Sequence, residues 1–442
     1  MRRRQRRSRF FPWGNSPSFH ARLRDVSATP TLQIETSPTP ILDRLKPIPE
    51  VKNVSTPRRY GLITAISVVC LPLFFIGLMI WSPSFLALAE RITRPAEHFL
   101  DTTLDSISSN WGPLVIATLL PFLLFAVVIV HEIGHLVCGL CVGFRLMSVR
   151  FGPVRISPPL RVSVKFEPKT GASGFVSMIP GKSENLRSRA MVFILGGPFA
   201  NLLAGFFILF LKVGGPVAAV FATLSILVGA ANLVPFRRLA LISDGKRMLM
   251  LLKNAGQGER LLAILQLAAE LQGGIEPENL SPDFIAKAIA VKDESPDTAA
   301  GYAFAYAAAW YEDAPDKAAQ LLETCLEYSQ FSAPVMRDAL RSDAAIFQAR
   351  KRNRVDLAEQ WLSEIPQKTL FPGQRLRAES AILEAQGNIE GALKKLDEVE
   401  TALMAIHDSY QRAVSLRFLQ RWRRELLEKQ TSAVGQESKT TA

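Results

Sequence analysis

The chain has 442 residues, of which 48% are hydrophobic and 21% are charged, and its mean hydropathy is +0.15. This composition argues against a protein that folds entirely in water. The formal net charge of +12 would suit a nucleic-acid partner. Much of that charge flanks apolar stretches, however, so we expect contact with phospholipid headgroups and no nucleic acid. The four cysteines, three of them in apolar stretches, indicate no disulfide framework.

The N-terminal segment 1–59 is basic and predicts a disordered tail. The opening MRRRQRRSRFF lacks the apolar core of a secretory signal peptide. Residues 12–59 are rich in Pro, Ser and Thr, which is typical of disorder. An organellar transit peptide is the alternative, because no Asp or Glu occurs before Asp25. The location we expect for the chain is a bacterial cell membrane, with an organellar membrane as the alternative.

Four long stretches without Asp, Glu, Lys or Arg follow this tail. Each holds at least the roughly 20 apolar residues that a helix needs to cross a bilayer. The stretches are Tyr60–Ala89, Ser106–Val130, Ala190–Leu211 and Val213–Phe236. The sequence therefore predicts an integral, multi-pass membrane protein with about four transmembrane helices.

The distribution of Lys and Arg predicts how these helices are oriented. Residues 1–60 contain 13 basic and 4 acidic residues, a net charge of 13 − 4 = +9. The segment 82–111 has two basic residues against four acidic ones, whereas 145–189 has nine basic residues against two acidic ones. Because basic loops stay on the cytoplasmic side, both ends of the chain should be cytosolic.

A His-Glu-x-x-His motif lies at the end of the second apolar stretch, in VVIVHEIGHLVCGL. On a helix, His131 and His135 are four residues apart and face the same side, so both imidazoles can reach one Zn²⁺. Glu132, beside them, can then serve as the general base that acts on water activated by the zinc. A chance string packed by neighbouring helices is the alternative, but ionisable groups inside a membrane segment are costly and usually functional.

A zinc site of this kind needs a third protein ligand, and Asp or Glu are the natural candidates. The fourth stretch ends in GAANLVPFRRLALISDGKRML, where Asn232 and Pro235 break the helix and Asp244 follows near the membrane. The predicted topology brings the ends of the second and fourth helices to the cytosolic side. We therefore expect Asp244 to lie near His131, although an Asp-Gly pair after a helix is by itself more often a turn.

These residues resemble the site-2 protease family of intramembrane zinc metalloproteases. HEIGH matches the first motif of that family, and NLVP followed by SDG looks like its second. The segment GGPFANLLAG, Gly196–Gly205, is similar to the Gly-Pro-x-x-Asn segment of the family's middle helix, although Gly and Ala there are also typical of helix packing. The resemblance covers roughly residues 112–255 and implies a membrane metalloprotease domain at 60–256.

The resemblance implies a role for each matching residue. The implied zinc ligands are His131, His135 and Asp244. Glu132 would be the catalytic acid and base, Asn232 would orient the substrate or the oxyanion, and Asn201 would lie near the active site. The spacing from Pro235 to Asp244 is longer than in the commonest form of the family motif, so an extended bend is needed to bring Asp244 to the metal.

Residues 145–189 are too few for a PDZ domain. Their short alternating runs, interrupted by Gly and Pro, instead predict β-hairpins at the membrane surface. Such strands could pair with an unwound substrate, because an exposed strand edge accepts an extended peptide.

The remaining residues predict a cytosolic helical domain at 257–430 and a disordered tail at 431–442. The segments NRVDLAEQWLSEIP and GNIEGALKKLDEVE align with Ala358 over Ala392, and a third segment aligns through Ala318. Helix pairs that recur at this spacing resemble tetratricopeptide repeats, with an ordinary helical bundle as the alternative. A cytosolic protein partner at these repeats is expected. The predicted fold is thus mainly α, with a short β-hairpin insertion.

Two functions of different classes fit these features. The leading hypothesis is a zinc-dependent endopeptidase that cleaves transmembrane segments of other membrane proteins, in regulated proteolysis. The alternative is a catalytically idle membrane scaffold that binds partners through its helical repeats. The intact Glu132 favours the enzyme, because a scaffold needs no general base. A zinc transporter would require further carboxylates or histidines on other membrane helices, and the first stretch has none.

Overall fold

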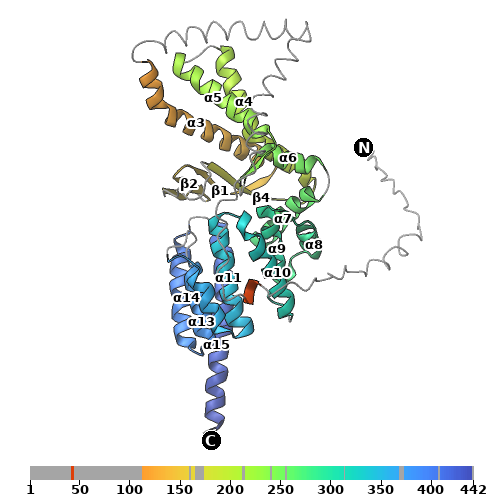
Figure 1. Cartoon of the computed structure of the whole chain (residues 1–442), viewed down its shortest axis with the longest axis vertical. Helices are drawn as coiled ribbons and strands as arrows, with labels where there is room; N and C mark the ends of the chain where they lie inside the picture. The colour runs from red at the N-terminus through yellow and green to blue at the C-terminus, as the bar shows by residue number, and fades with distance from the viewer. Residues whose placement is uncertain are drawn as a thin grey trace, which may run out of the picture. The chain divides into compact units, whose positions relative to one another are not determined.

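The structure is a computed structural model, and all residues it describes belong to the compact unit Ile41–Ala442 (Figure 1). The described residues are 41–43, 112–158, 161–164, 174–211, 215–238, 241–253, 256–312, 314–367, 373–406 and 409–440. The predicted first membrane helix, at 60–89, lies outside them. So do the residues of the predicted N-terminal tail other than 41–43.

Three apolar helices carry the predicted metalloprotease region. They are α3 (Gly112–Cys141), α4 (Leu186–Leu211) and α5 (Gly215–Leu233), with α3 packed on α4 and α4 on α5. A β-carbon on Gly134 would overlap the carbonyl oxygen of Gly196, and one on Gly196 would overlap that of Gly134. Glycine at both positions therefore lets the backbones of α3 and α4 approach closely, as small residues do between membrane helices.

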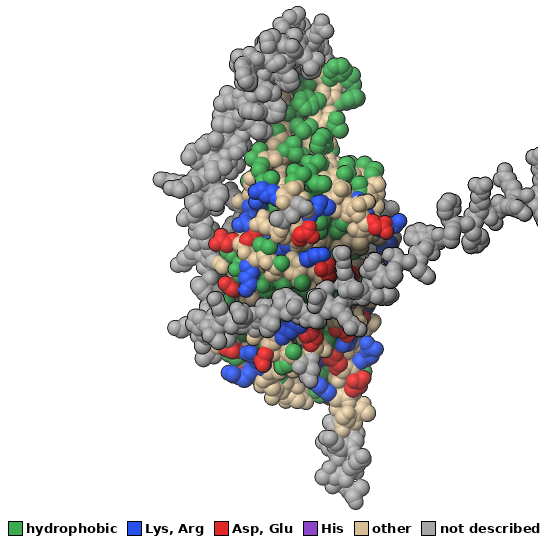
Figure 2. Space-filling model, turned by 90° about the vertical axis from the view of Figure 1, so that its right-hand side faces the viewer, with side chains coloured by type: hydrophobic (Ala, Val, Ile, Leu, Met, Phe, Trp, Pro, Cys, Tyr) green, Lys and Arg blue, Asp and Glu red, His purple; other side chains and the backbone are tan. Residues whose placement is uncertain are grey.

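The surface of these helices is apolar. Large hydrophobic side chains stand exposed on them, including Phe122, Leu203, Phe207 and Phe210. Figure 2 shows hydrophobic side chains gathered at this end of the visible face, with Lys, Arg, Asp and Glu over the rest. Ala117–Cys141 and Leu186–Leu211 are long and apolar enough to cross a membrane, and Val217–Leu233 is a shorter apolar helix. Two of the four predicted spans thus have the required length and composition.

A four-stranded antiparallel sheet follows α3, as the alternating runs predict. Its strands are β1 (Phe144–Phe151), β2 (Val154–Ser157), β3 (Arg161–Val164) and β4 (Gly174–Pro180), in the order β3-β2-β1-β4. The β1–β2 turn contains Gly152 at φ 55°, a conformation that glycine adopts without strain. In this sheet β4 pairs with β1 alone, so its other edge faces away from the sheet.

A helical domain forms the C-terminal part of the described chain. Its helices are α7 (Gln257–Gln272), α8 (Pro282–Ile289), α9 (Pro296–Ala309), α10 (Pro315–Tyr328), α11 (Pro334–Arg352), α12 (Val355–Ser363), α13 (Gln374–Ala385), α14 (Ile389–Met404) and α15 (Ser409–Thr440), with short 3-10 turns η3 (Pro277–Asn279) and η4 (Ser329–Phe331). The helices α8 to α11 each begin with Pro, whose fixed φ suits the first helical turn.

Consecutive helices of this domain pack against each other. The three alanines that align in the sequence, Ala318, Ala358 and Ala392, lie in α10, α12 and α14, and each is at most 1% exposed. The predicted helix pairs are therefore present, while their assignment to the tetratricopeptide type stays a prediction.

The boundary predicted at residue 256 does not separate two independent cores. On α7, Leu261 joins a hydrophobic cluster with Phe144 of β1, Met178 of β4 and Leu186 of α4. Arg187 of α4 also forms an ion pair with Glu259 of α7. The first helix after the predicted boundary is thus part of the packing that supports the sheet.

The last helix, α15, is held to the domain by charged side chains. Arg350 of α11 lies 2.7 Å from both Glu384 of α13 and Glu425 of α15. Burial alone would raise the pKa of Glu384, but Arg350, together with Lys429 and Trp422, lowers that pKa below its ordinary value.

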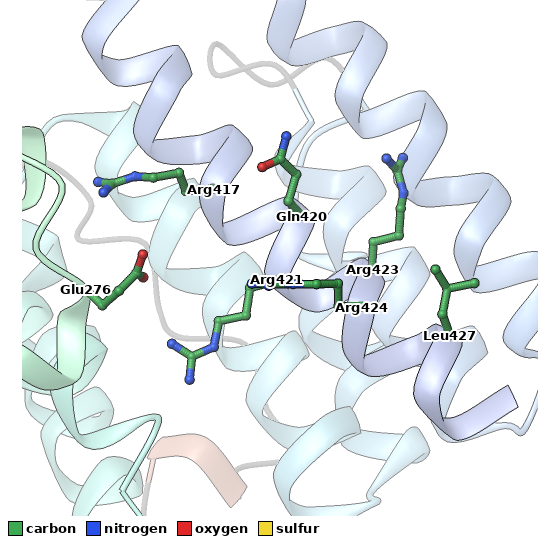
Figure 3. A pocket seen from close by; sticks show the side chains of 7 residues that line it. All are labelled: Glu276, Arg417, Gln420, Arg421, Arg423, Arg424 and Leu427. Carbon is green, nitrogen blue, oxygen red and sulfur yellow. The ribbon is translucent and has the colours of Figure 1, made fainter. Parts of the chain in front are cut away.

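A basic pocket on α15, shown in Figure 3, is lined by Glu276, Arg417, Gln420, Arg421, Arg423, Arg424 and Leu427.

Two segments predicted as disordered include residues that the structure places in helices. The helix α15 continues to Thr440. In the predicted N-terminal tail, Ile41–Asp43 form a 3-10 turn, η1, in which Leu42 is 1% exposed within the core of the helical domain. Burial of this leucine accounts for the order of these three residues.

Candidate metal centre

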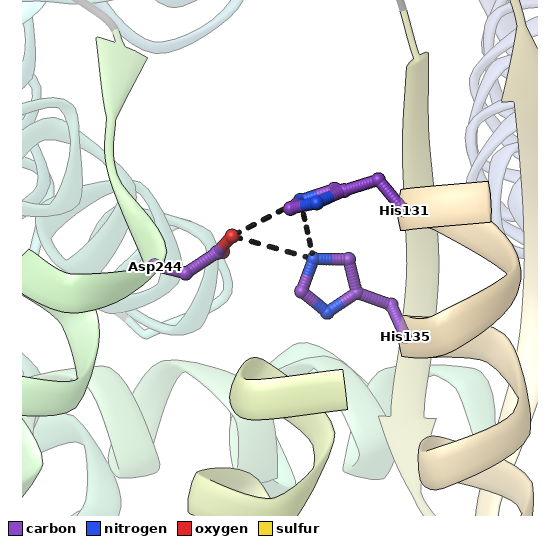
Figure 4. A group of neighbouring side chains, drawn as sticks. All are labelled: His131, His135 and Asp244. Carbon is purple, nitrogen blue, oxygen red and sulfur yellow. Dashed lines mark hydrogen bonds and ion pairs between the residues drawn. The ribbon is translucent and has the colours of Figure 1, made fainter. Parts of the chain in front are cut away.

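Two histidines of α3 project together from one face of the helix. His131 and His135 are 9% and 8% exposed, and their Nε2 atoms lie 3.2 Å apart. Figure 4 shows both rings turned toward the carboxylate of Asp244, which comes from the start of α6 (Asp244–Leu252). The structure therefore brings together the three residues that the sequence predicts as ligands.

The long spacing before Asp244 is taken up by a small hairpin. Arg237–Arg238, β5, pairs antiparallel with Leu241–Ile242, β6, and this returns the chain to the end of α5. Ser243 then donates its hydroxyl to the carbonyl of Val234 at 2.7 Å and caps α6 by accepting from the N–H of Lys246. The extended bend that the sequence required is thus a two-stranded turn.

A glycine fixes how closely α6 approaches the broken end of α5. A β-carbon at Gly245 would overlap the carbonyl oxygen of Leu233. The residue after Asp244 must therefore lack a side chain for the carboxylate to reach its place beside the two histidines.

The ligand atoms have the separations that a tetrahedral zinc requires. Oδ2 of Asp244 lies 3.1 Å from Nε2 of His131 and 3.5 Å from Nε2 of His135. Ligand atoms bound at about 2.0–2.1 Å in a tetrahedron are about 3.3 Å from one another. Two imidazoles and one carboxylate also form a common ligand set for catalytic zinc, which leaves a position open for water or substrate.

The hydrogen bond made by His135 selects the tautomer that a metal needs. Its Nδ1 lies 2.9 Å from the carbonyl oxygen of Phe193 and 3.3 Å from the main-chain nitrogen of Gly197. The shorter contact is to an atom that can only accept, and this favours the tautomer with the proton on Nδ1. The lone pair is then on Nε2, which points toward Asp244. A partner that fixes the ring in this way is the usual outer support of a metal-binding histidine.

Asn201 of α4 contacts the outer nitrogen of the other histidine. Its side chain is fully buried, and its amide nitrogen Nδ2 lies 3.3 Å from Nδ1 of His131. The side-chain oxygen of Asn201 accepts from the Ser225 hydroxyl at 3.3 Å. Ser225 in turn donates to the main-chain oxygen of Asn201 at 2.9 Å.

Three atoms that can ligate a metal, Nε2 of His131, Nε2 of His135 and Oδ2 of Asp244, face one another in a buried space. A cation between them would compensate for burial of the Asp244 carboxylate. The space is kept open by Gly197, whose β-carbon would overlap Nε2 of His135 and lie 2.7 Å from Nε2 of His131. The residues therefore fit a zinc ion, and the doublet Gly196-Gly197 before Pro198 is the sequence signal that could have identified Gly197.

The two remaining predicted site residues, Glu132 and Asn232, have different surroundings. Glu132 is 7% exposed and borders the first residue of β4, since a β-carbon at Gly174 would lie 2.9 Å from its Oε1. Asn232, on the last turn of α5, donates its side-chain amide to the carbonyl of Val228 at 3.1 Å. Among the described residues, Asn232 makes no hydrogen bond to the histidines or to Asp244.

The family model described as Peptidase family M50 matches residues 119–217. This is the site-2 protease family, whose members are membrane-embedded zinc metalloproteases. It spans less than a quarter of the chain; it includes the histidine motif and Asn201 but ends before Asp244. Comparisons with curated proteins and with solved structures found no match. The third ligand therefore rests on the geometry described above.

Proposed function

We propose that this chain is an intramembrane zinc-dependent endopeptidase that cleaves transmembrane segments of other membrane proteins. The observation that carries the proposal is the meeting of His131, His135 and Asp244 at zinc-ligand distances. The two histidines lie on the apolar helix α3, with Glu132 next to His131. A structural role alone would not require a carboxylate next to the three ligands.

The protein residues divide the work of peptide hydrolysis. The two histidines and Asp244 would hold zinc, which supplies a Lewis acid that activates water and polarises the scissile carbonyl. Glu132 takes a proton from the attacking water and passes it to the leaving amine. Phe193 holds the ring of His135, and Asn201 holds the ring of His131, each through the Nδ1 atom of that histidine. Asn232, at the break after α5, is proposed to contact the substrate.

The position of β4 suggests how a substrate is presented. A transmembrane helix has its carbonyls bonded internally and must unwind before it can be cleaved. The free edge of β4 offers main-chain hydrogen bonds to an extended peptide, and Gly174, at the start of this strand, lies against Glu132. A peptide added to this edge would run toward the general base, and a side chain at position 174 would obstruct it.

The setting of the activity follows from the same features. The enzyme would sit in a cell membrane of bacterial type, with an organellar membrane as the alternative, and with both ends of the chain in the cytosol. Release of a cytosolic regulator from a membrane precursor is the proposed outcome of cleavage. The helical domain is proposed to bind the cytosolic part of the substrate or of a partner protein.

The experiment compares the parent enzyme with the Glu132→Gln and His131→Ala variants. Each is expressed in membranes, and new peptide ends inside apolar segments are sought by mass spectrometry. Glu132→Gln should lower cleavage by at least about 10² to 10⁴, while the purified variant keeps its zinc. His131→Ala should lose both zinc and cleavage. Cleavage by Glu132→Gln at the parent rate would favour the idle scaffold and end the proposal.

A further inference from the structure

A short turn from the N-terminal part of the chain fills a pocket in the helical domain. The turn is η1, Ile41–Asp43, and Figure 1 shows it, in red, beside α10 and α11. Leu42 is 1% exposed and belongs to the same hydrophobic core as residues of α9 to α15. We call this site the Leu42 pocket; its polar residues are Glu323, Gln348, Arg352 and Trp361.

The pocket binds the backbone of the turn at both ends. The carboxylate of Glu323, on α10, accepts from the N–H groups of Ile41 and Leu42, the second at 2.9 Å. The carbonyl oxygen of Leu42 accepts from the Gln348 amide at 2.7 Å and from the Trp361 indole at 3.2 Å. A turn of three residues can form few hydrogen bonds within itself. Here three helices of the domain, α10, α11 and α12, supply the hydrogen-bond partners.

The pocket also recognises the side chain of Asp43. Nη1 of Arg352 donates to its carboxylate at 2.7 Å, and the second N–H of Gln348 donates to the same oxygen at 3.1 Å. An apolar slot followed by a cationic contact therefore selects an apolar residue and then an acid. The recognised sequence is Ile-Leu-Asp.

The buried donors indicate that the site is built for such a turn. Gln348 is fully buried and Trp361 is 3% exposed, and the donor groups described above all point to Leu42 or Asp43. If the turn were removed, these donors would be left without acceptors inside an apolar core, which is strongly unfavourable. The sequence of the helical domain is thus adapted to an occupant that it does not itself contain.

We propose that the helical domain is a peptide-binding module for a short turn of the type apolar-Leu-Asp, and that the chain's own Ile41–Asp43 is its occupant. The turn precedes the membrane helices and the pocket follows them, so the contact ties together the two ends of the membrane domain. This contact is separate from the metal centre and does not depend on the protease proposal.

The contact also limits the path of the chain through the membrane. Ile41–Asp43 and the helical domain can meet only on one side, so the number of crossings between residues 43 and 257 is even. The helices α3 and α4 are long and apolar enough to cross, and the shorter apolar helix α5 would supply a third crossing. The fourth crossing predicted from the sequence is the charge-free stretch 60–89, which lies outside the described residues.

The first experiment measures binding of a fluorescent peptide with the sequence of residues 37–47 to the full-length protein in detergent. In the parent chain the tethered turn competes at high effective concentration, so the peptide should bind weakly. The Leu42→Asp variant, whose turn cannot enter the pocket, should bind it at least tenfold more tightly. A peptide carrying the same Leu-to-Asp change should bind neither protein.

The second experiment exchanges the charges of the ion pair. A label on the side chain at position 41 is cross-linked to the helical domain in the parent, in Asp43→Arg, in Arg352→Asp and in the double variant. Each single change should lower the cross-linking yield severalfold, and the double variant should recover it. Lys317→Asp on α10, which alters an exposed ion pair between Lys317 and Glu312, is the matched control and should leave the yield unchanged.

Several results would overturn the proposal. Equal peptide binding to the parent and to Leu42→Asp would mean that the peptide binds elsewhere. Absence of binding to a Leu42→Asp chain that keeps its helical content would mean that the pocket does not recognise this sequence. If Leu42→Asp loses helical content and the peptide does not restore it, the turn is an inseparable part of the core. Labelling of residue 43 and the helical domain from opposite sides of the membrane would also exclude the contact.

Discussion

The backbone of Gly197 lies directly against the ring of His135, so that no side chain fits between them. A β-carbon at position 197 would overlap Nε2 of His135 and would come within 2.7 Å of Nε2 of His131. These are the two nitrogens that face Asp244. The helix α4 therefore closes one side of the metal centre with its backbone.

Gly197→Ala should lower zinc occupancy and abolish cleavage, because the added methyl group takes up space that the ligand atoms need. Zinc content of the purified protein, measured by atomic emission, is the test. Gly205→Ala is the matched control, since its β-carbon would press on Ala222 and Ile226 of α5 and should disturb helix packing while zinc stays bound. Equal zinc loss in both variants would assign the effect to packing.

Asp244→Ala should remove the third ligand and reduce zinc occupancy strongly, because two imidazoles alone bind zinc weakly. Asp244→Asn keeps an oxygen in the same place without its charge and should lose less zinc. Competition with a chelator of known affinity ranks the parent and the two variants. Parent-like affinity in both variants would show that another residue completes the site.

Asn201→Ala should weaken zinc binding or activity by about 10- to 100-fold, the usual effect of removing the partner of a metal-binding histidine. The cause is loss of the side-chain amide that contacts Nδ1 of His131, which leaves the ring free to turn. Zinc affinity and the pH profile of cleavage are both measured. Ser225→Ala removes only the hydrogen bonds that hold Asn201 and should lower zinc affinity less than Asn201→Ala does. A larger loss in Ser225→Ala would contradict the role given to Asn201.

Truncation should distinguish α7 from the rest of the helical domain. A chain ending after Gly256 loses Leu261 and Glu259, which pack on the sheet and pair with Arg187, and should lose zinc or precipitate. A chain ending after Gly273 keeps these contacts and should keep zinc and cleave a generic transmembrane peptide, with altered preference among native substrates. Equal zinc content in both chains would mean that α7 does not support the metal centre.

The sequence by itself determined the class of chemistry and the local elements. The motif His131-Glu132-x-x-His135 predicts two ligands and a base, because a spacing of four residues on a helix leaves few alternatives. Long apolar stretches without charged residues predict α3 and α4. Each of these predictions depends on one continuous segment of the sequence. The sheet at β1 to β4 followed from alternation, a pattern that is equally local.

Only the tertiary structure decided which distant residues complete the site. Asp244 lies beside His131 because the β5–β6 hairpin turns the chain back and because Gly245 packs closely on Leu233. No local sequence pattern predicts either contact. The role of Asn201 as a partner of His131 depends on how α4 packs on α3, because the two residues are 70 positions apart. Asn232, which the motif placed at the substrate, is hydrogen-bonded within its own helix.

The turn Ile41–Asp43 illustrates the same limit at the greatest separation along the chain. Its surroundings in sequence are rich in Pro and Ser, and composition of that kind predicts disorder because it offers little apolar area to bury. A single leucine can nevertheless be ordered when a pocket elsewhere supplies both the apolar walls and the hydrogen-bond partners. Those partners, Glu323, Gln348 and Trp361, lie far along the chain, beyond the apolar helices α3 to α5, so only the folded chain brings them together.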